Sequence, residues 1–150
     1  MIERKEKLLP HDFDAEQGLL MAAFCPGALD KIKGLVSADD FYSTSAGLIF
    51  EKMMEFHGAE RGFTISLVEQ SLKDHPEYEN IRLALDSLRP ITSTVITHFA
   101  EIVRELADRR RCIRASYSVY ECLFDLSKPV DQVRGFLRVQ VPGLLTGVAQ

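Results

Sequence analysis

Apolar residues recur at intervals of three and four along almost the whole chain, which is the spacing that lines one face of an α-helix. No long segment alternates apolar and polar residues as a half-buried β-strand does. Pro and Gly interrupt the pattern repeatedly up to Pro90, whereas the segment 95–126 contains neither residue. We therefore predict an all-α protein in which several short helices precede two longer ones.

The first half of the chain is predicted to form a helical head of about five to six short helices, residues 9–94. Asp12 or Asp14 can cap the first helix, because a short carboxylate side chain accepts a hydrogen bond from a free amide at a helix start. A longer helix is expected from about Ser45 to His57. A charged arm, residues 1–8, precedes the head, and we expect it to be flexible.

The second half is predicted to form an antiparallel helical hairpin, residues 95–141. A helix over 95–126 would be about 45 Å long at 1.5 Å per residue. Ser127-Lys128-Pro129 is typical of a turn followed by a helix start. The second helix is expected to end at Pro142-Gly143, which leaves a flexible tail, 142–150.

Both hairpin helices carry an apolar stripe. Such a stripe is either the hairpin's own core or a seam between two copies of the chain, and a large exposed apolar stripe usually marks an interface. We assign to this oligomer interface Phe99, Ile102, Val103, Leu106, Ile113, Tyr117, Tyr120, Val133 and Leu137.

The net charge of −4 is unevenly distributed. Residues 8–94 carry 14 acidic and 7 basic side chains, so this half would repel nucleic-acid phosphates. The main basic cluster could be a solvated helix face, a contact with a partner or subunit, or a nucleic-acid contact. Because stacking aromatics do not interleave with it, we expect direct nucleic-acid binding to be weak or absent. The cluster consists of Arg109, Arg110, Arg111 and Arg114.

The sequence contains none of the usual catalytic motifs. It has no GxxxxGK[ST] loop to hold ATP phosphates, and no HExxH, GxSxG or GxGxxG. Its three cysteines lack metal-ligand spacing, which indicates reduced thiols in a cytoplasmic protein. No apolar run approaches the length of a membrane span. We therefore expect no catalytic residue, no cofactor, no metal ion and no membrane contact, and no ATP hydrolysis by this chain alone.

Three segments carry a family resemblance. The first is Pro10-His11 followed by Ala15-Glu16-Gln17, the second runs from Ser37 to Phe50, and the third is the segment 98–105 followed by Arg110-Arg111. In this order and spacing they resemble the N-terminal domain of the bacterial replicative DNA helicases, the DnaB family. The chain diverges from that family at Ala46-Gly47, where a polar or basic pair is usual. The residues that carry the structural motif are Pro10, His11, Glu16, Ser37, Asp40, Phe41, Tyr42 and Phe50.

The resemblance implies a non-catalytic module of the DNA replication machinery, built as a helical head plus a hairpin. In that family, hairpins pair into dimers, and dimers form a trimer-of-dimers collar on the helicase ring. The implied partners are the chain itself, primase, and a helicase or helicase loader. If the chain is a fragment, its parent would be an ATP-dependent DNA helicase. Two alternatives stay open: a free-standing homologue from a phage or mobile element that binds a host helicase or primase, and an unrelated all-α nucleic-acid-binding protein.

Overall fold

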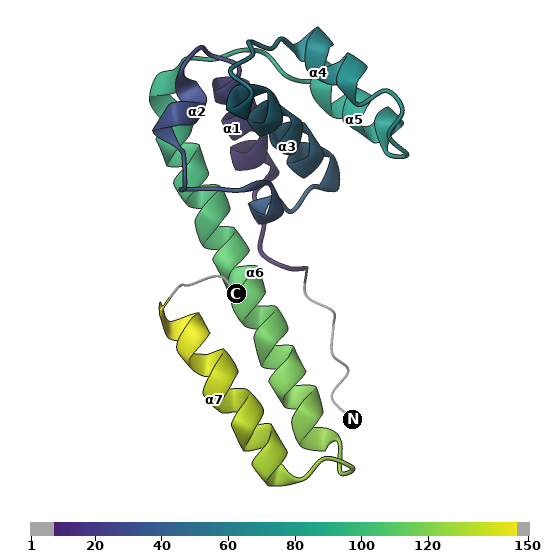
Figure 1. The fold of residues 1–150 in the computed structure, drawn as a ribbon, viewed down its shortest axis with the longest axis vertical. Helices are drawn as coiled ribbons and strands as arrows, with labels where there is room; N and C mark the ends of the chain where they lie inside the picture. Colours follow the sequence, from purple (N-terminus) through teal and green to yellow (C-terminus); the bar gives the residue numbers. More distant parts are fainter. Residues whose placement is uncertain (1–7, 147–150) are drawn as a thin grey trace. The chain divides into compact units, whose positions relative to one another are not determined.

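The computed structural model describes residues 8–146, with side chains up to Gly143, and over this range it is entirely helical (Figure 1), which confirms the predicted fold class. Contacts divide the chain into two compact units, a head over Pro10–Ala107 and a hairpin unit that contains the chain from Asp108 onward. The helices are α1 (Phe13–Ala23), α2 (Ala28–Lys31), η1 (Ala38–Asp40, a 3₁₀ turn), α3 (Thr44–Gly58), α4 (Ile65–Ser71), α5 (Tyr78–Asp86), η2 (Ser93–Val95, a 3₁₀ turn), α6 (Ile96–Phe124) and α7 (Val130–Thr146).

Helix α3 lies at the centre of the head. It contacts α1, η1, α4 and α5, and its inward side chains Ile49, Phe50 and Met53 are almost completely buried. Helix α1 adds Leu19 and α5 adds Ile81 to the same core. These positions follow the three- and four-residue spacing of the sequence, so the amphipathic pattern determines which face of each helix is buried.

The start of α6 belongs to the head. Ile96, Ala100 and Val103 lie in the head's core, at 0%, 0% and 2% exposure. One face of these turns is therefore already buried within the chain. Phe99 packs beside α1, where a Cβ atom added at Gly18 would come within 2.6 Å of its ring. The sequence assigned this part of α6 to the hairpin, because helical phase shows which face is apolar but not which element covers it.

Helix α1 begins where the sequence indicates. The Asp12 carboxylate accepts a hydrogen bond from the amide of Ala15 at 2.9 Å, so Asp12, rather than Asp14, is the cap. The end expected for the last helix was wrong. Helix α7 continues through Pro142 to Thr146. A proline has no backbone N–H to donate within the helix, and its ring crowds the preceding turn. This weakens a helix but does not always end it.

The burial of Val103 gives a test of its role. We expect Val103→Ala to lower the free energy of unfolding by about 1.5–3 kcal/mol, because it removes buried methyl groups and leaves a cavity. Urea denaturation measures this, and Glu101→Ala, an exposed change on the same helix, should alter stability by less than about 0.5 kcal/mol. A loss of stability that appears only at protein concentrations high enough for self-association would instead place Val103 at an interface between copies.

Candidate interaction site

A buried carboxylate joins α1 to the start of α3. Glu16 is 3% exposed, and its two oxygens accept hydrogen bonds from the amides of Tyr42 at 3.1 Å and Ser43 at 3.0 Å. Ser43 in turn caps α3 by accepting from the amide of Ala46. A negative charge is favourable at this end of a helix, where amides point outward without helical partners. Glu16 therefore fixes the position at which α3 begins.

A second buried carboxylate joins the same region to α6. Asp40 is fully buried and accepts a hydrogen bond from the amide of Ser37 at 2.8 Å, at the 3₁₀ turn η1. Arg104 on α6 lies 3.7 Å away and forms an ion pair with it. A buried carboxylate is stable when hydrogen bonds, an opposite charge, or both replace its hydration. Sequence reasoning assigned no role to Arg104, because no spacing rule relates side chains so far apart in the chain.

Aromatic rings complete this network. His11 stacks on Tyr42 with ring centroids 4.2 Å apart and planes at 9°, and Phe13 packs at the edge of both rings. Behind them, Phe41 and Phe50 are buried with their centroids 5.1 Å apart. Seven of the eight motif residues thus contact another motif residue within the head, namely His11, Glu16, Ser37, Asp40, Phe41, Tyr42 and Phe50. Within the described residues, no group of His, Cys, Asp or Glu side chains is placed to hold a metal ion.

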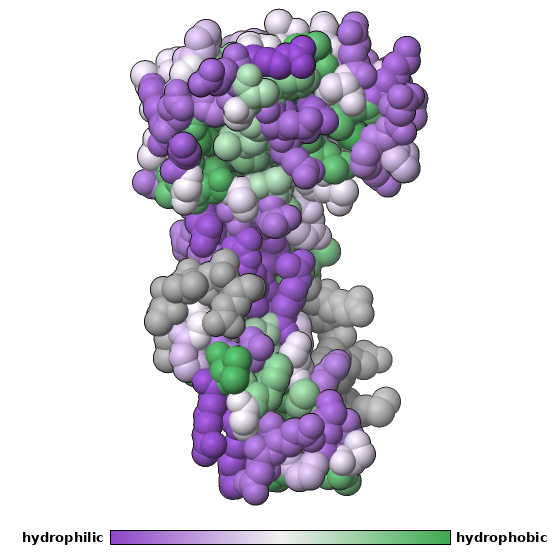
Figure 2. Space-filling view, viewed as in Figure 1, coloured by the Kyte–Doolittle hydropathy of each residue, from purple (hydrophilic) through white to green (hydrophobic). Residues whose placement is uncertain are grey.

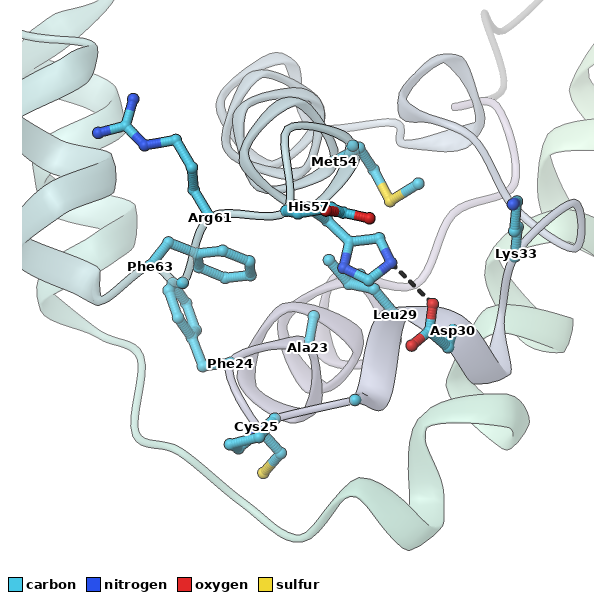
Figure 3. A pocket seen from close by; sticks show the side chains of 15 residues that line it. Ala23, Phe24, Cys25, Leu29, Asp30, Lys33, Met54, His57, Arg61 and Phe63 are labelled. Carbon is cyan, nitrogen blue, oxygen red and sulfur yellow. Dashed lines mark hydrogen bonds and ion pairs between the residues drawn. The ribbon is translucent and has the colours of Figure 1, made fainter.

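A cavity of about 740 Å³ opens elsewhere on the head, at the C-terminal ends of α1 and α3 (Figure 3). Phe24 and Phe63 meet edge to face on one side of it, with centroids 5.7 Å apart. His57 Nε2 lies 2.8 Å from Asp30 Oδ1 across its middle. No sequence signal indicates this cavity, because helix ends and the loop after α3 form it and no motif marks those positions.

Beyond Ala107 the described chain exposes eight large apolar side chains, and we call this set of residues the hairpin surface. Tyr117, Tyr120 and Phe124 follow the i, i+3, i+7 spacing of one helix face and are 50%, 44% and 69% exposed. Figure 2 shows hydrophobic side chains open to solvent among hydrophilic ones in this part of the molecule. The other large apolar side chains of this surface are Leu123, Leu126, Val130, Val139 and Val141.

The structure divides the nine residues that the sequence assigned to an oligomer interface. Val103 and Val133 are buried within the chain, and Phe99 and Ile102 pack against the head's core. Of the rest, Tyr117 and Tyr120 are exposed, while Leu106, Ile113 and Leu137 are half-buried. Sequence reasoning left Leu123, Phe124, Val130, Val139 and Val141 out of the interface, although the apolar spacing continues beyond Tyr120.

The four clustered arginines have different surroundings. Arg111 pairs with Asp108 one turn earlier on α6, with Nη1 and Oδ1 2.9 Å apart. Arg110 is 4% exposed, so it contributes almost nothing to a basic surface. Arg109 and Arg114 are exposed. The cluster therefore does not present a continuous basic patch. Within the part of the chain that the structure describes, no helix is long and apolar enough to cross a membrane.

Comparisons with known proteins agree on one family. The family described as DnaB-like helicase N terminal domain matches residues 8–105. The replicative DNA helicase DnaB of Synechocystis sp. is 28% identical over 131 residues, which cover 84% of this chain and only 15% of that protein's length. The crystal structure of the N-terminal domain of DnaB helicase from Mycobacterium tuberculosis matches with a TM-score of 0.75 at 18% identity, over 88% of this chain and 96% of that one.

The Glu16 network predicts a specific loss of stability. We expect Glu16→Gln to lower the free energy of unfolding by about 1–3 kcal/mol, because an amide side chain has one acceptor oxygen and turns its NH₂ group toward the second backbone amide. Chemical denaturation followed by circular dichroism measures the change. The control is Glu51→Gln, the same chemical change at an exposed position of α3. Equal effects of the two changes would show that the buried carboxylate has no special role.

Proposed function

Because this chain belongs to the family of DnaB-like helicase N-terminal domains, we propose that it acts as a non-catalytic interaction and oligomerisation domain of the DNA replication machinery. The resemblance predicted from the three sequence segments is confirmed by the family match. The proposal concerns the surfaces that the domain offers to other proteins, since its buried charged groups, Glu16 and Asp40, bind within the head.

The observation that carries the proposal is the hairpin surface. Fully burying one large apolar side chain contributes about 1.5–3 kcal/mol, and this unit exposes eight of them beyond Ala107. A two-fold interface uses the same surface on both copies, so each apolar residue contributes twice. Self-association through the hairpin surface is therefore the arrangement that removes most apolar area from water.

The finer parts of the proposal concern partners. We place primase, a helicase and a helicase loader among them, and a hexameric ring built as a trimer of dimers among the assemblies. A role in replication would place the chain in the cytoplasm.

The chain spans 15% of the length of the curated helicase that it matches, so both a fragment of an ATP-dependent helicase and a free-standing homologue that binds one fit the sequence. The observations favour no separate nucleic-acid-binding function, since Arg110 is buried and Arg111 is paired.

Light scattering across protein concentration tests the assembly. We expect a dimer or larger assembly. We expect Phe124→Glu to raise the dissociation constant of this assembly by at least about tenfold, because the interface would then have to bury an unpaired carboxylate. Phe124 is a better probe than Ile102, whose side chain packs against the head's core. Ser118→Glu adds the same charge at an exposed position about 100° around α6 from Tyr117 and should leave the assembly intact.

Two results would contradict the proposal. If the unaltered chain is monomeric at every concentration, the hairpin surface does not drive self-association. If Phe124→Glu and Ser118→Glu have equal effects, the contact lies on another face of the helix.

A further inference from the structure

The cavity at the ends of α1 and α3 lies within the head and has no part in the hairpin surface. Apolar side chains of Phe24, Leu29, Met54 and Phe63 line it, and polar groups converge on it from α2, α3 and the loop that follows α3. Its volume of about 740 Å³ lies in the range of cavities that hold a drug-sized ligand or a few peptide side chains. The aromatic rings of Phe24 and Phe63 offer large apolar surfaces for packing, and the flexible thioether of Met54 can change rotamer to fit a bound side chain.

Glu60, on the rim of this cavity, has an unusual backbone conformation. It is the one non-glycine residue with positive φ, 56°, among the described residues. Its amide bonds to the carbonyl of His57, and the amide of Arg61 bonds to that of Phe56, the two bonds of a Schellman motif. Glycine normally occupies this position, because a Cβ atom is unfavourable there. Strained positions that persist in spite of such a cost concentrate at functional sites.

The head that contains the cavity is net negative, while the cavity lining itself holds two carboxylates and two cationic side chains. Residues 10–107 carry 16 acidic and 8 basic side chains, a net charge of −8 for the head. The C-terminal ends of α1 and α3, which carry partial negative charge, both border the cavity. Asp30 contributes a carboxylate whose side chain is 69% exposed, and neither Asp30 nor Glu60 pairs with a lysine or arginine among the described residues.

Two cationic side chains also border the cavity, at opposite sides. Lys33 lies at the edge near Asp30, and the guanidinium of Arg61 is directed away from His57 (Figure 3). Arg61 packs over the ring of Phe56, with 5.6 Å between its Cζ atom and the ring centroid. The centre of the cavity is thus left to His57, Asp30 and the aromatic wall.

We propose that this cavity binds a basic, apolar peptide segment of a partner protein. The partner's arginine or lysine would bind between the carboxylates of Asp30 and Glu60, and its large apolar side chain would pack on Phe24, Met54 and Phe63. A cation beside ring faces gains further stabilisation from their negative charge. The acidic head attracts such a segment from a distance, since complementary charge mainly raises association rates. The inference deepens the partner-binding part of the proposed function and uses residues outside the hairpin surface.

Fluorescence polarisation with the full chain and labelled synthetic peptides tests this proposal. The probe is Gly-Arg-Leu-Phe-Lys-Gly, and the comparison peptides replace its basic residues by acids or its Leu-Phe by Ser-Ser. We expect the basic, apolar probe to bind and both comparison peptides to bind more weakly. We also expect Glu60→Gln and Asp30→Asn each to weaken binding about three- to fivefold, the size of an exposed ion pair. Asp74→Asn, an exposed carboxylate outside the cavity, should leave affinity unchanged.

Glu60→Gly separates a binding role from a structural one. Glycine removes the steric cost of the left-handed backbone conformation, so this variant should melt at a higher temperature. Because it also lacks the carboxylate, it should still bind the probe about three- to fivefold more weakly. Unchanged affinity in Glu60→Gly, stronger binding of the acidic peptide, or an equal loss in Asp74→Asn would each overturn the proposal. The last outcome would indicate non-specific attraction to the acidic head.

The two proposals fail independently. Phe124→Glu should retain peptide affinity while losing assembly, and Glu60→Gln should retain assembly while losing peptide affinity. A chain that assembles normally but binds none of the peptides removes only the cavity's role.

Discussion

The head is organised around the carboxylate of Glu16 and the two amides that it binds. A carboxylate taken out of water is strongly destabilising unless hydrogen bonds replace its hydration, and Tyr42 and Ser43 supply them. This requirement fixes α1 against the start of α3. It also orients Tyr42, so that its ring meets His11, and it leaves Asp40 buried where Arg104 can neutralise it. Separate segments thereby depend on one buried charge, and losing it would leave two amides without partners.

Local chemistry explains why the sequence predicted the fold so closely. The Asp12 cap and the helix expected from about Ser45 to His57 are properties of neighbouring residues, and the structure contains both, the helix as α3. The helix end predicted at Pro142 was wrong, because a proline only weakens a helix locally and α7 continues beyond it. Helix bounds are set by the balance along a whole segment rather than by one residue.

Long-range pairing explains what the sequence could not predict. The ion pair of Arg104 with Asp40 and the packing of Phe99 on Gly18 join positions that only the folded chain brings together. The apolar pattern of α6 continues from the head's core to the exposed Tyr117, so periodicity cannot show where burial within the chain ends. The cavity depends on helix ends, and the left-handed Glu60 beside it has no sequence signature, since glycine is the residue that normally indicates such a turn.

The hairpin unit has too little core of its own. Beyond Ala107, Val133 is the one buried apolar side chain among the described residues, while Tyr117, Tyr120, Phe124 and their neighbours remain open to solvent. Two helices joined by a turn gain most of their stability from burying an apolar face, so a hairpin with this surface uncovered is marginally stable. Any molecule that binds the folded hairpin and not the unfolded chain stabilises it by mass action. Covering the hairpin surface and ordering the hairpin would therefore be one coupled equilibrium, and the proposed assembly would supply the core that the single chain lacks.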